Sequence, residues 1–378
     1  MKEGWIVKKL GEVCEIQGGS TPKRTERLFW ENGTYPWFTV DDIREQGRVI
    51  TDTKQKVTLL AWDKLRKFPK DTIMLCCTAS VGEYAITKIP ITSNQQFNGL
   101  VIKDKYLMSP MYLFYYVSTL KHVLKNLSGK ATIDFVSAEK VRSLQIPIPP
   151  FPEQSRIVEE LDLLSNIIEK KRQQLSELDN LAQSIFYDMF GDPVTNEKGW
   201  EVKKIGEIST FYNGKAHEKN IVEFSEILLV NAKFISSNGE IKKYSDIQLF
   251  PLYKNDITMV MSDLPNGKTL AKCYLIEKDD TYTLNQRICA FRGYDQNPIF
   301  LKYVLNRNKY YLSFDDGNGQ TNLRKSDVVN CPIIIPPLHL QQLFAQKIEA
   351  IEKEKELIKQ SIKETEELFN SRMDYYFG

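Results

Sequence analysis

The chain of 378 residues contains a long stretch that occurs twice, and this repeat constrains the fold more than any other feature. The first copy runs from Pro147 to Pro193 and the second from Ile335 to Gly378. Paired prolines open both copies, Gln154 aligns with Gln341, and a Phe-Gly pair lies near the end of each. Because proline is favoured at helix starts and glycine just past helix ends, each copy predicts one long helix. The chain is therefore expected to be two units, each a globular part followed by a long helix.

The openings of the two units repeat as well. The segments GWIVKKLGEV and GWEVKKIGEI begin at Gly4 and Gly199, and a match this dense indicates duplication. Each opening is followed by expected strands and then by an expected helical stretch. In the first unit the strands are at 35–47 and 71–82 and the helix is at 109–127. In the second unit the strands are at 227–239 and 255–267 and the helix is at 298–314. The predicted fold class is α+β, with two similar mixed α/β domains, two long helices and an internal pseudo-two-fold repeat.

Both long stretches carry apolar residues in alternating steps of four and three. These are Ile157, Leu161, Leu164, Ile168, Leu175, Leu178, Ala182 and Ile185 in the first, and Phe344, Ile348, Ile351, Ile358, Ile362 and Phe369 in the second. A 3.5-residue repeat of this length is typical of a coiled coil, interrupted here at Lys171, Lys355, Thr365 and Arg372. We expect the helices to pair antiparallel with the globular parts at opposite ends. The alternative is that each apolar stripe packs on its own globular part.

These patterns divide the chain into four predicted parts. They are a first globular domain at 1–150, a central helix at 151–191, a second globular domain at 192–337 and a C-terminal helix at 338–378. Counting Lys, Arg, Asp and Glu, residues 1–150 carry 22 basic and 15 acidic side chains, whereas 151–191 carry 4 and 8. A phosphate backbone is therefore expected to meet the globular parts and not the helices, although 192–337 is nearly neutral.

The composition argues against a membrane protein and a metal site. No apolar run reaches the length of a membrane span, and the first residues lack the apolar segment of a signal peptide. The six cysteines show no CxxC spacing and the three histidines are scattered, so we expect reduced, buried cysteines, a cytoplasmic location and no metal.

No catalytic motif is convincing. The segment GKT at 267–269 resembles the end of a phosphate loop, but Ser262 stands where that loop needs glycine. The IPPF and IPPL segments lack the preceding Asn or Asp that a methyltransferase would use to hold an adenine amine. We therefore predict no catalytic residue and no cofactor.

Polar side chains on the predicted loops are the candidates for DNA contact, because Lys and Arg suit phosphates and guanine while Asn and Gln suit adenine. In the first unit they are Thr21, Lys23, Arg24, Thr78, Ser80, Gln95, Gln96, Lys130 and Thr132. In the second unit they are Lys215, Lys219, Ser262, Lys268, Gln286, Arg287, Gln320, Asn322 and Arg324.

Several of these motifs together resemble a known family. They are PIPPFPEQSRIV at the start of the first long helix, FYDMFGDP at its end, the GW-x-VKK opening, the Asn-Gln dipeptides at 94–95 and 285–286, and the duplication itself. The chain resembles, over its full length, the DNA-specificity subunit of type I restriction–modification enzymes. The second copy departs from the motif, since Leu340 stands where Glu153 stands in the first.

The resemblance implies a non-catalytic subunit that binds double-stranded DNA. Each globular part would be a target-recognition domain that reads one half of a split sequence. The helices would set the gap between the halves and dock two methyltransferase subunits, and motor-nuclease subunits would join the complete complex. Two other classes of function stay open from the residues alone: a coiled-coil scaffold whose globular ends bind proteins, and an enzyme that acts on DNA by itself.

Overall fold

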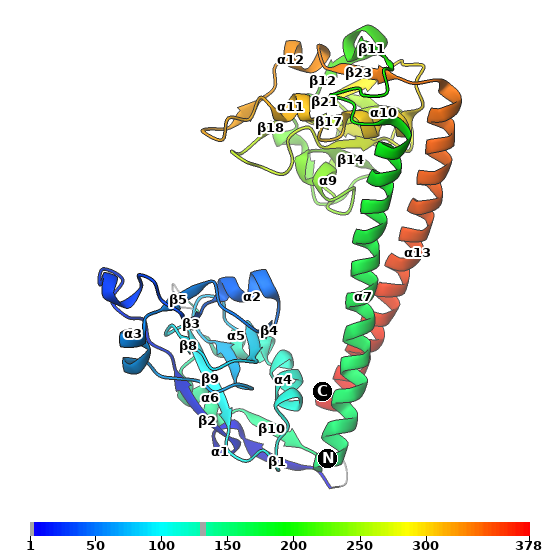
Figure 1. Cartoon of the computed structure of the whole chain (residues 1–378). Helices are drawn as coiled ribbons and strands as arrows, with labels where there is room; N and C mark the ends of the chain where they lie inside the picture. Colours follow the sequence, from blue (N-terminus) through cyan, green and yellow to red (C-terminus); the bar gives the residue numbers. More distant parts are fainter. Residues whose placement is uncertain (1–3, 129–133) are drawn as a thin grey trace. The chain divides into compact units, whose positions relative to one another are not determined.

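The computed structural model describes residues 4–128 and 134–378 (Figure 1). The chain forms two compact units. Unit 1 contains residues up to 171 together with 361–378, and unit 2 contains 172–360. The long helices α7 (Phe151–Phe190) and α13 (Leu338–Phe377) therefore each contribute one part to each unit.

Unit 1 is built on a five-stranded sheet with the order β2-β9-β6-β7-β4 and a three-stranded sheet with the order β5-β3-β8. Its strands are β1 (Ile6–Lys9), β2 (Cys14–Gly18), β3 (Tyr35–Phe38), β4 (Val49–Ile50), β5 (Gln55–Val57), β6 (Ile73–Cys76), β7 (Tyr84–Thr87), β8 (Thr92–Ser93), β9 (Phe97–Ile102) and β10 (Gln145–Ile148). Its shorter helices are α1 (Leu10–Val13), η1 (Arg27–Phe29), α2 (Val40–Gln46), α3 (Leu59–Lys64), α4 (Pro110–Thr119), α5 (Lys121–Leu127) and α6 (Ala138–Ser143).

Unit 2 repeats this plan with a four-stranded sheet, β12-β21-β17-β19, and a five-stranded sheet, β13-β15-β14-β20-β16. Its strands are β11 (Glu201–Lys204), β12 (Thr210–Asn213), β13 (Ile221–Val222), β14 (Ile227–Val230), β15 (Tyr244–Ser245), β16 (Pro251–Leu252), β17 (Ile257–Val260), β18 (Ser262–Asp263), β19 (Cys273–Leu275), β20 (Tyr282–Leu284), β21 (Ile288–Arg292), β22 (Thr321–Asn322) and β23 (Pro332–Ile335). Its shorter helices are α8 (Ile205–Ile208), η2 (Glu218–Asn220), α9 (Ala232–Ser236), α10 (Pro298–Leu305), α11 (Lys309–Leu312) and α12 (Lys325–Val329).

The strand pairs of the two units correspond residue by residue. In unit 1, β6 pairs antiparallel with β9 and aligns Ile73 with Leu100. In unit 2, β17 pairs antiparallel with β21 and aligns Ile257 with Phe291. The opening strand of each globular part also pairs with its closing strand, as β1 with β10 and β11 with β23. The predicted α+β class with two similar mixed domains is therefore confirmed, and the repeat in the sequence is a repeat in topology.

One local expectation was wrong. The segments 35–47 and 227–239 were expected to be strands ending near turns, but each has four strand residues followed by a short helix, α2 or α9. Thr39 and Asn231 precede these helices, and Asn231 accepts a hydrogen bond from the backbone of Phe234. Such capping side chains favour a helix start over the continuation of a strand.

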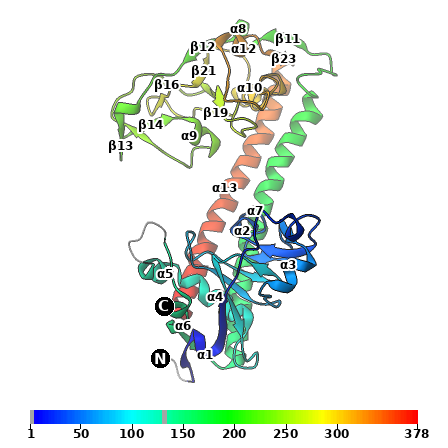
Figure 2. The ribbon, with the colours of Figure 1, turned by 90° about the vertical axis from the view of Figure 1, so that its left-hand side faces the viewer.

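A buried glutamine connects each long helix to the fold of its unit. The side chain of Gln154 accepts a hydrogen bond from the backbone N–H of Ser109, just before α4, and donates to the carbonyl of Pro149. Gln341 accepts from the N–H of Asn297, just before α10, and donates to the carbonyl of Pro336. Because these two bonds are equivalent, the residues of α4 and α10 can be aligned position by position. In unit 1, Figures 1 and 2 show α4 beside the C-terminal end of α13, where Tyr112 packs on Phe377.

The long helices run antiparallel to each other in both units, as predicted. In unit 1, Arg372 forms an ion pair with Glu160, while Lys171 donates to the hydroxyls of Ser361 and Thr365. In unit 2, Phe186 and Phe190 pack on Phe344, and Lys355 binds Asp179 at 2.8 Å. The polar residues that interrupt the apolar repeat, at 171, 355, 365 and 372, thus all contact the other helix. Polar contacts across a helix pair, here partly or fully enclosed, specify the register of the pair.

Candidate nucleic-acid interface

Two glycines mark the same point in the two units. Gly19 follows β2, and a Cβ at this position would lie 2.3 Å from the carbonyl oxygen of Ser93. Gly214 follows β12, and a Cβ there would lie 1.9 Å from the carbonyl oxygen of Asn285. Only glycine therefore permits the first loop to run against the loop that contains the Asn-Gln dipeptide.

The candidate loops of unit 1 join at one end of its larger sheet. The N–H of Ser20 donates to the carbonyl of Ser93, which holds the loop at 19–24 against the Asn-Gln loop at 93–97. The N–H of Cys77 donates to the carbonyl of Gln96, and the N–H of Val136 donates to the carbonyl of Cys77. Loops from four separate parts of the chain thus form one continuous face, which we call the loop face.

Unit 2 builds the same face with the same bonds. The N–H of Lys215 donates to the carbonyl of Leu284, the N–H of Met261 to that of Arg287, and the N–H of Leu323 to that of Met261. The short strands β18 and β22 add a second link, since Ser262 pairs with Asn322. The two loop faces therefore share these backbone hydrogen bonds, while their side chains differ.

In unit 1 the structure brings some candidates together and leaves others apart. The hydroxyl of Thr21 donates to the side chain of Gln95 at 2.5 Å, and Gln96 accepts from Asn94 at 3.0 Å. Thr78 and Ser80 are half-buried on the adjacent loop, and Lys23 is exposed. Lys130 and Thr132 lie outside the described residues.

Arg24 extends the face of unit 1 toward its smaller sheet. Its guanidinium lies over the rings of Trp30 and Trp37, at 4.1 and 4.5 Å, and donates to Gln55 at 2.9 Å. Arginine stacked on aromatic faces is held in a fixed orientation and keeps donors for other partners. Arg24 is the best-positioned cation among the unit 1 candidates.

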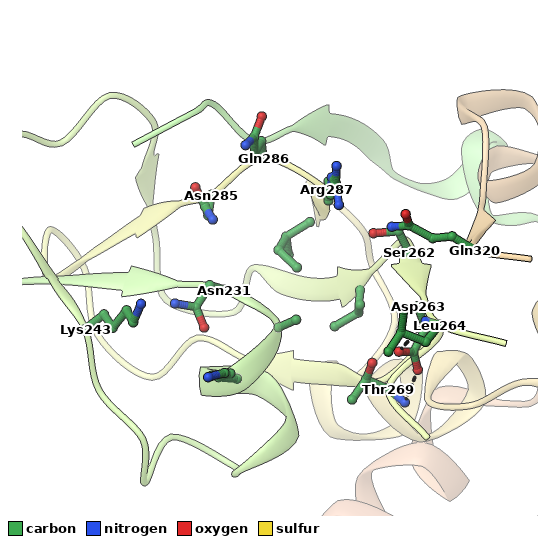
Figure 3. Close-up of a pocket in the computed structure, with 14 residues that line it drawn as sticks. Asn231, Lys243, Ser262, Asp263, Leu264, Thr269, Asn285, Gln286, Arg287 and Gln320 are labelled. Carbon is green, nitrogen blue, oxygen red and sulfur yellow. Dashed lines mark hydrogen bonds between the residues drawn. The ribbon is translucent and has the colours of Figure 1, made fainter. Parts of the chain in front are cut away.

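Unit 2 has a hollow of about 600 Å³ on its loop face (Figure 3). Four candidates line it, and they are Ser262, Gln286, Arg287 and Gln320. The remaining candidates, Lys215, Lys219, Lys268, Asn322 and Arg324, are exposed on the connected loops and do not line the hollow. Arg287 lies in the turn before β21 and has a φ of 65°, a left-handed conformation that is rare for arginine.

Several lining residues had not been selected from the sequence. They are Asn231, Lys233, Lys243, Asp263, Leu264, Thr269 and Asn285, together with buried apolar positions. Asn231 directly follows β14 and Lys243 directly precedes β15, two strands of the five-stranded sheet. This part of the unit lies far in the sequence from the Asn-Gln dipeptide and the other motifs. Asn285 belongs to the recurring Asn-Gln dipeptide, and that recurrence was a usable signal.

Asp263 holds the loop beside the hollow. Its carboxylate accepts hydrogen bonds from the backbone N–H groups of Thr269 at 2.6 Å and Leu270 at 3.0 Å, drawn in part in Figure 3. Burial alone raises the pKa of this carboxyl group, but the hydrogen bonds from Thr269 and its neighbours outweigh burial and lower the pKa. The GKT segment is therefore a turn around a carboxylate. The negative charge of Asp263 would repel a phosphate at this place.

The structure thus contains two similar domains, each with a polar loop face and each including parts of the two long helices. A family model described as "Type I restriction modification DNA specificity domain" matches residues 2–180 and again 197–367. The chain therefore belongs to the type I restriction–modification DNA specificity family. It is a DNA-recognition subunit of a restriction–modification complex, and the catalytic activities of such a complex lie in other subunits.

Individual relatives agree with this assignment. The MjaIX specificity subunit of Methanocaldococcus jannaschii is 27% identical, over 92% of this chain and 86% of its own length. The EcoprrI specificity subunit of Escherichia coli is 32% identical over 57% of each chain. Two solved structures share the fold. The S subunit from M. genitalium has a TM-score of 0.55 at 15% identity and covers 99% of this chain and 96% of its own. A chain from a study of type I complex assembly has a TM-score of 0.60 at 16% identity and covers 100% and 98%.

Within residues 4–128 and 134–378, no three His, Cys, Asp or Glu side chains gather in a way that would hold a metal ion. None of the described helices combines the length and the apolar character that a bilayer crossing requires. His217, which lies beside the loop face, is buried and bonded to Thr283 and to the carbonyl of Lys215.

Proposed function

We propose that the chain reads a split DNA target, with the loop face of unit 1 on one half and that of unit 2 on the other. The observation that carries this proposal is that matching backbone hydrogen bonds hold the loops of the two loop faces together, while the side chains of the two faces differ. Equivalent scaffolds support the same mode of docking, whereas different side chains present different hydrogen-bond donors and acceptors to base edges. The candidates in both units, including those that do not line the hollow, remain predicted DNA contacts.

The proposal extends to the long helices. They would fix the gap between the two half-sites and provide the surface on which two methyltransferase subunits dock, and motor-nuclease subunits would join the restricting complex. Support comes from the polar contacts along the helix pair, which set one register. The apolar residues at the helix ends support docking less, because Phe186, Phe190 and Tyr376 are buried within their own units. We also retain as a prediction the division of the chain into four parts, at 1–150, 151–191, 192–337 and 338–378.

We place this complex in the cytoplasm. The support is that all six cysteines are buried and unpaired with one another. Burial raises the pKa of the Cys14 thiol to about 12 and that of Cys77 to about 11, so these thiols stay protonated and unreactive at neutral pH.

Substitutions confined to one loop face provide the test. Gln286→Ala combined with Arg287→Asn alters unit 2 only, and asparagine tolerates the left-handed conformation at 287. Thr21→Ala combined with Gln95→Ala alters unit 1 only. Each variant would be purified with the methyltransferase subunit, and its methylated sites would be mapped by sequencing.

We expect each variant to relax or change one half of the target and to leave the other half and the gap unchanged. DNA binding should weaken with rising salt as phosphate contacts require. Lys254→Met, on an exposed turn away from the loop face, is the control and should leave the target unchanged. If a one-unit variant changed both halves together, the division of labour between the units would be refuted.

A further inference from the structure

Unit 2 contains a second cavity, of about 450 Å³, which shares no residue with the hollow on its loop face. It lies among α10, the strand β19, the loop after α9 and the parts of α7 and α13 that belong to unit 2. Four lysines contribute to its lining: Lys272, Lys302, Lys355 and Lys359. The acidic residues in the lining are Asp179, Glu240 and Glu352.

The duplication shows how this cavity arises. The strand pairing that aligns Leu75 with Tyr84 in unit 1 aligns Met259 with Cys273 in unit 2, so Cys273 occupies the position of Tyr84. The helices α4 and α10 both begin at a proline one residue after their glutamine-bound N–H, so Lys302 occupies the position of Phe114. In unit 1 the rings of Tyr84 and Phe114 pack together, with centroids 5.2 Å apart. In unit 2 a small thiol and a lysine replace two rings, and the space they filled is open.

The charges in the cavity are not balanced. Lys355 is bound by both Asp179 and Glu352, at 2.8 and 2.9 Å, and Lys359 by Glu356 at 2.9 Å. Lys272 donates only to the neutral carbonyl of Ser236, at 3.0 Å. The ammonium group of Lys302 has no hydrogen bond or ion pair with any described residue, although the side chain is largely enclosed. The ammonium groups of Lys272 and Lys302 are therefore without an ion pair among the described residues, and the lining, with four lysines and three carboxylates, carries a net positive charge.

An enclosed, unpaired ammonium group is costly unless an anion accompanies it. Burial lowers the pKa of Lys302, and the carboxylate of Glu352 offsets this only in part. The equivalent position in unit 1 is apolar, so the fold itself does not require a cation here. A bound anion would provide the missing partner.

We propose that this cavity, which we call the Lys302 cavity, binds the phosphate group of a small molecule. A phosphate, with two charges and several acceptor oxygens, suits two lysines without an ion pair better than a single carboxylate does. The cavity is much larger than inorganic phosphate, so the phosphate can belong to a larger molecule. Tyr303 and Asn306, which also line the cavity, offer a ring and an amide to the remainder of such a ligand.

Isothermal titration calorimetry on the full chain without DNA tests this proposal. The titrants are inorganic phosphate, pyrophosphate and ADP, with acetate as the singly charged control. We expect binding of at least one phosphate compound and no binding of acetate. Tighter binding of ADP than of pyrophosphate would identify a nucleotide as the source of the phosphate, and the reverse order would identify an inorganic phosphate.

Variants link the binding to the cavity. Lys302→Met should weaken it at least tenfold, Lys302→Arg should retain most of it, and Cys273→Tyr with Lys302→Phe should abolish it by restoring the unit 1 pair. Lys254→Met is the matched control on an exposed turn and should bind normally. Retained DNA binding by each variant would show that it is folded. Absence of heat from all three phosphate compounds up to about 10 mM, or unchanged binding by Lys302→Met, would overturn the proposal.

Discussion

At the scale of single residues, the buried glutamines are the clearest link between sequence and fold. Gln154 and Gln341 were recognised as equivalent because both follow the paired prolines, and the structure shows that both bind the backbone ahead of a helix in their own unit. A neighbouring position behaves differently. In unit 1 the indole of Trp5 donates to the side chain of Glu153. In unit 2 the equivalent of Glu153 is Leu340, whose side chain cannot accept a hydrogen bond, and Trp200 donates instead to the carbonyl of Phe190.

Replacing Gln154 with alanine should destabilise unit 1. The change would leave the N–H of Ser109 and the carbonyls of Pro149 and Leu107 without their partner. We expect a loss of about 2–3 kcal/mol in the free energy of unfolding, because buried polar groups without partners are costly. Urea denaturation would measure it. Gln173→Ala, at an exposed site on the same helix, should change the stability by less than about 0.5 kcal/mol.

Asp263 predicts a pH dependence with a definite sign. Its folded-state pKa is lowered from the ordinary value of 3.8, so the stabilisation is present above that value and is lost as the pH falls through the folded-state pKa. Asp263→Asn removes the charge and places an amide against the N–H groups of Thr269 and Leu270. The wild type should therefore be more stable than the variant at pH 7, and the difference should shrink below about pH 4. A difference that stayed constant from pH 7 to pH 3 would contradict this assignment.

At the scale of elements, the long helices were predictable and the small strands were not. The apolar repeat of the long helices extends over many residues between proline and glycine boundaries, so one atypical residue does not change the prediction. Strands of two residues, such as β4, β8 and β18, depend on partners far away in the chain. The segments after β3 and β14 show the same limit, because a single capping residue converts an expected strand into a helix.

The lysine within the helix pair of unit 2 gives a prediction at this scale. The side chain of Lys355 is only 11% exposed and is bound by Asp179 and Glu352. Asp179→Ala should destabilise the chain by about 1 kcal/mol or more, because it leaves an enclosed charge without its partner on the other helix. Lys355→Met should be neutral or stabilising, since it removes the enclosed charge together with its desolvation cost.

Thermal unfolding of the two single variants and of the double variant would measure this coupling. Glu356→Ala is the control, because its ion pair with Lys359 is exposed, and it should have little effect. If Lys355→Met proved as harmful as Asp179→Ala, the pair would be a true source of stability.

At the scale of the whole molecule, the sequence predicted the duplication, the fold class and the family, because each is encoded in many residues. The candidate site was predicted only in part. The loops could be chosen from turn residues and recurring dipeptides, but which side chains share a hollow depends on the second sheet of each unit. Asn231 and Lys243 reach the hollow of unit 2 from that sheet, and no local pattern marks them. The Lys302 cavity likewise brings together residues far apart in the sequence, such as Asp179, Cys273 and Lys302, and no local pattern marks it.

The proposed role of the helices as a spacer gives a prediction for the molecule as a whole. Deleting residues 168–174 from α7 and 359–365 from α13 removes one heptad from each and takes out Lys171 together with both of its partners. Seven residues span about 10 Å of helix and preserve the phase of the repeat to within about 20°. We expect each half-site to be unchanged and the preferred gap to shorten by about three base pairs, at 3.4 Å each.

Methylation mapping with the deletion variant would measure the gap directly. The control is a variant that replaces the same two segments with other heptads of equal length and the same apolar pattern, and it should keep the original gap. An unaltered gap in a folded deletion variant would refute the spacer role.

The pairing of the first and last strands of each globular part has a consequence for inheritance. Because β1 lies beside β10 and β11 beside β23, the chain enters and leaves each globular part at one place. Genetic exchange that replaced everything between these strands would deliver a different loop face while the strand pair stayed in place. The glutamine of the long helix binds backbone groups of the exchanged segment, so the incoming segment would need an N–H at the same place but no particular side chain. If each loop face reads one half-site, as proposed, a lineage would in this way acquire a new half of its recognition sequence in a single recombination event.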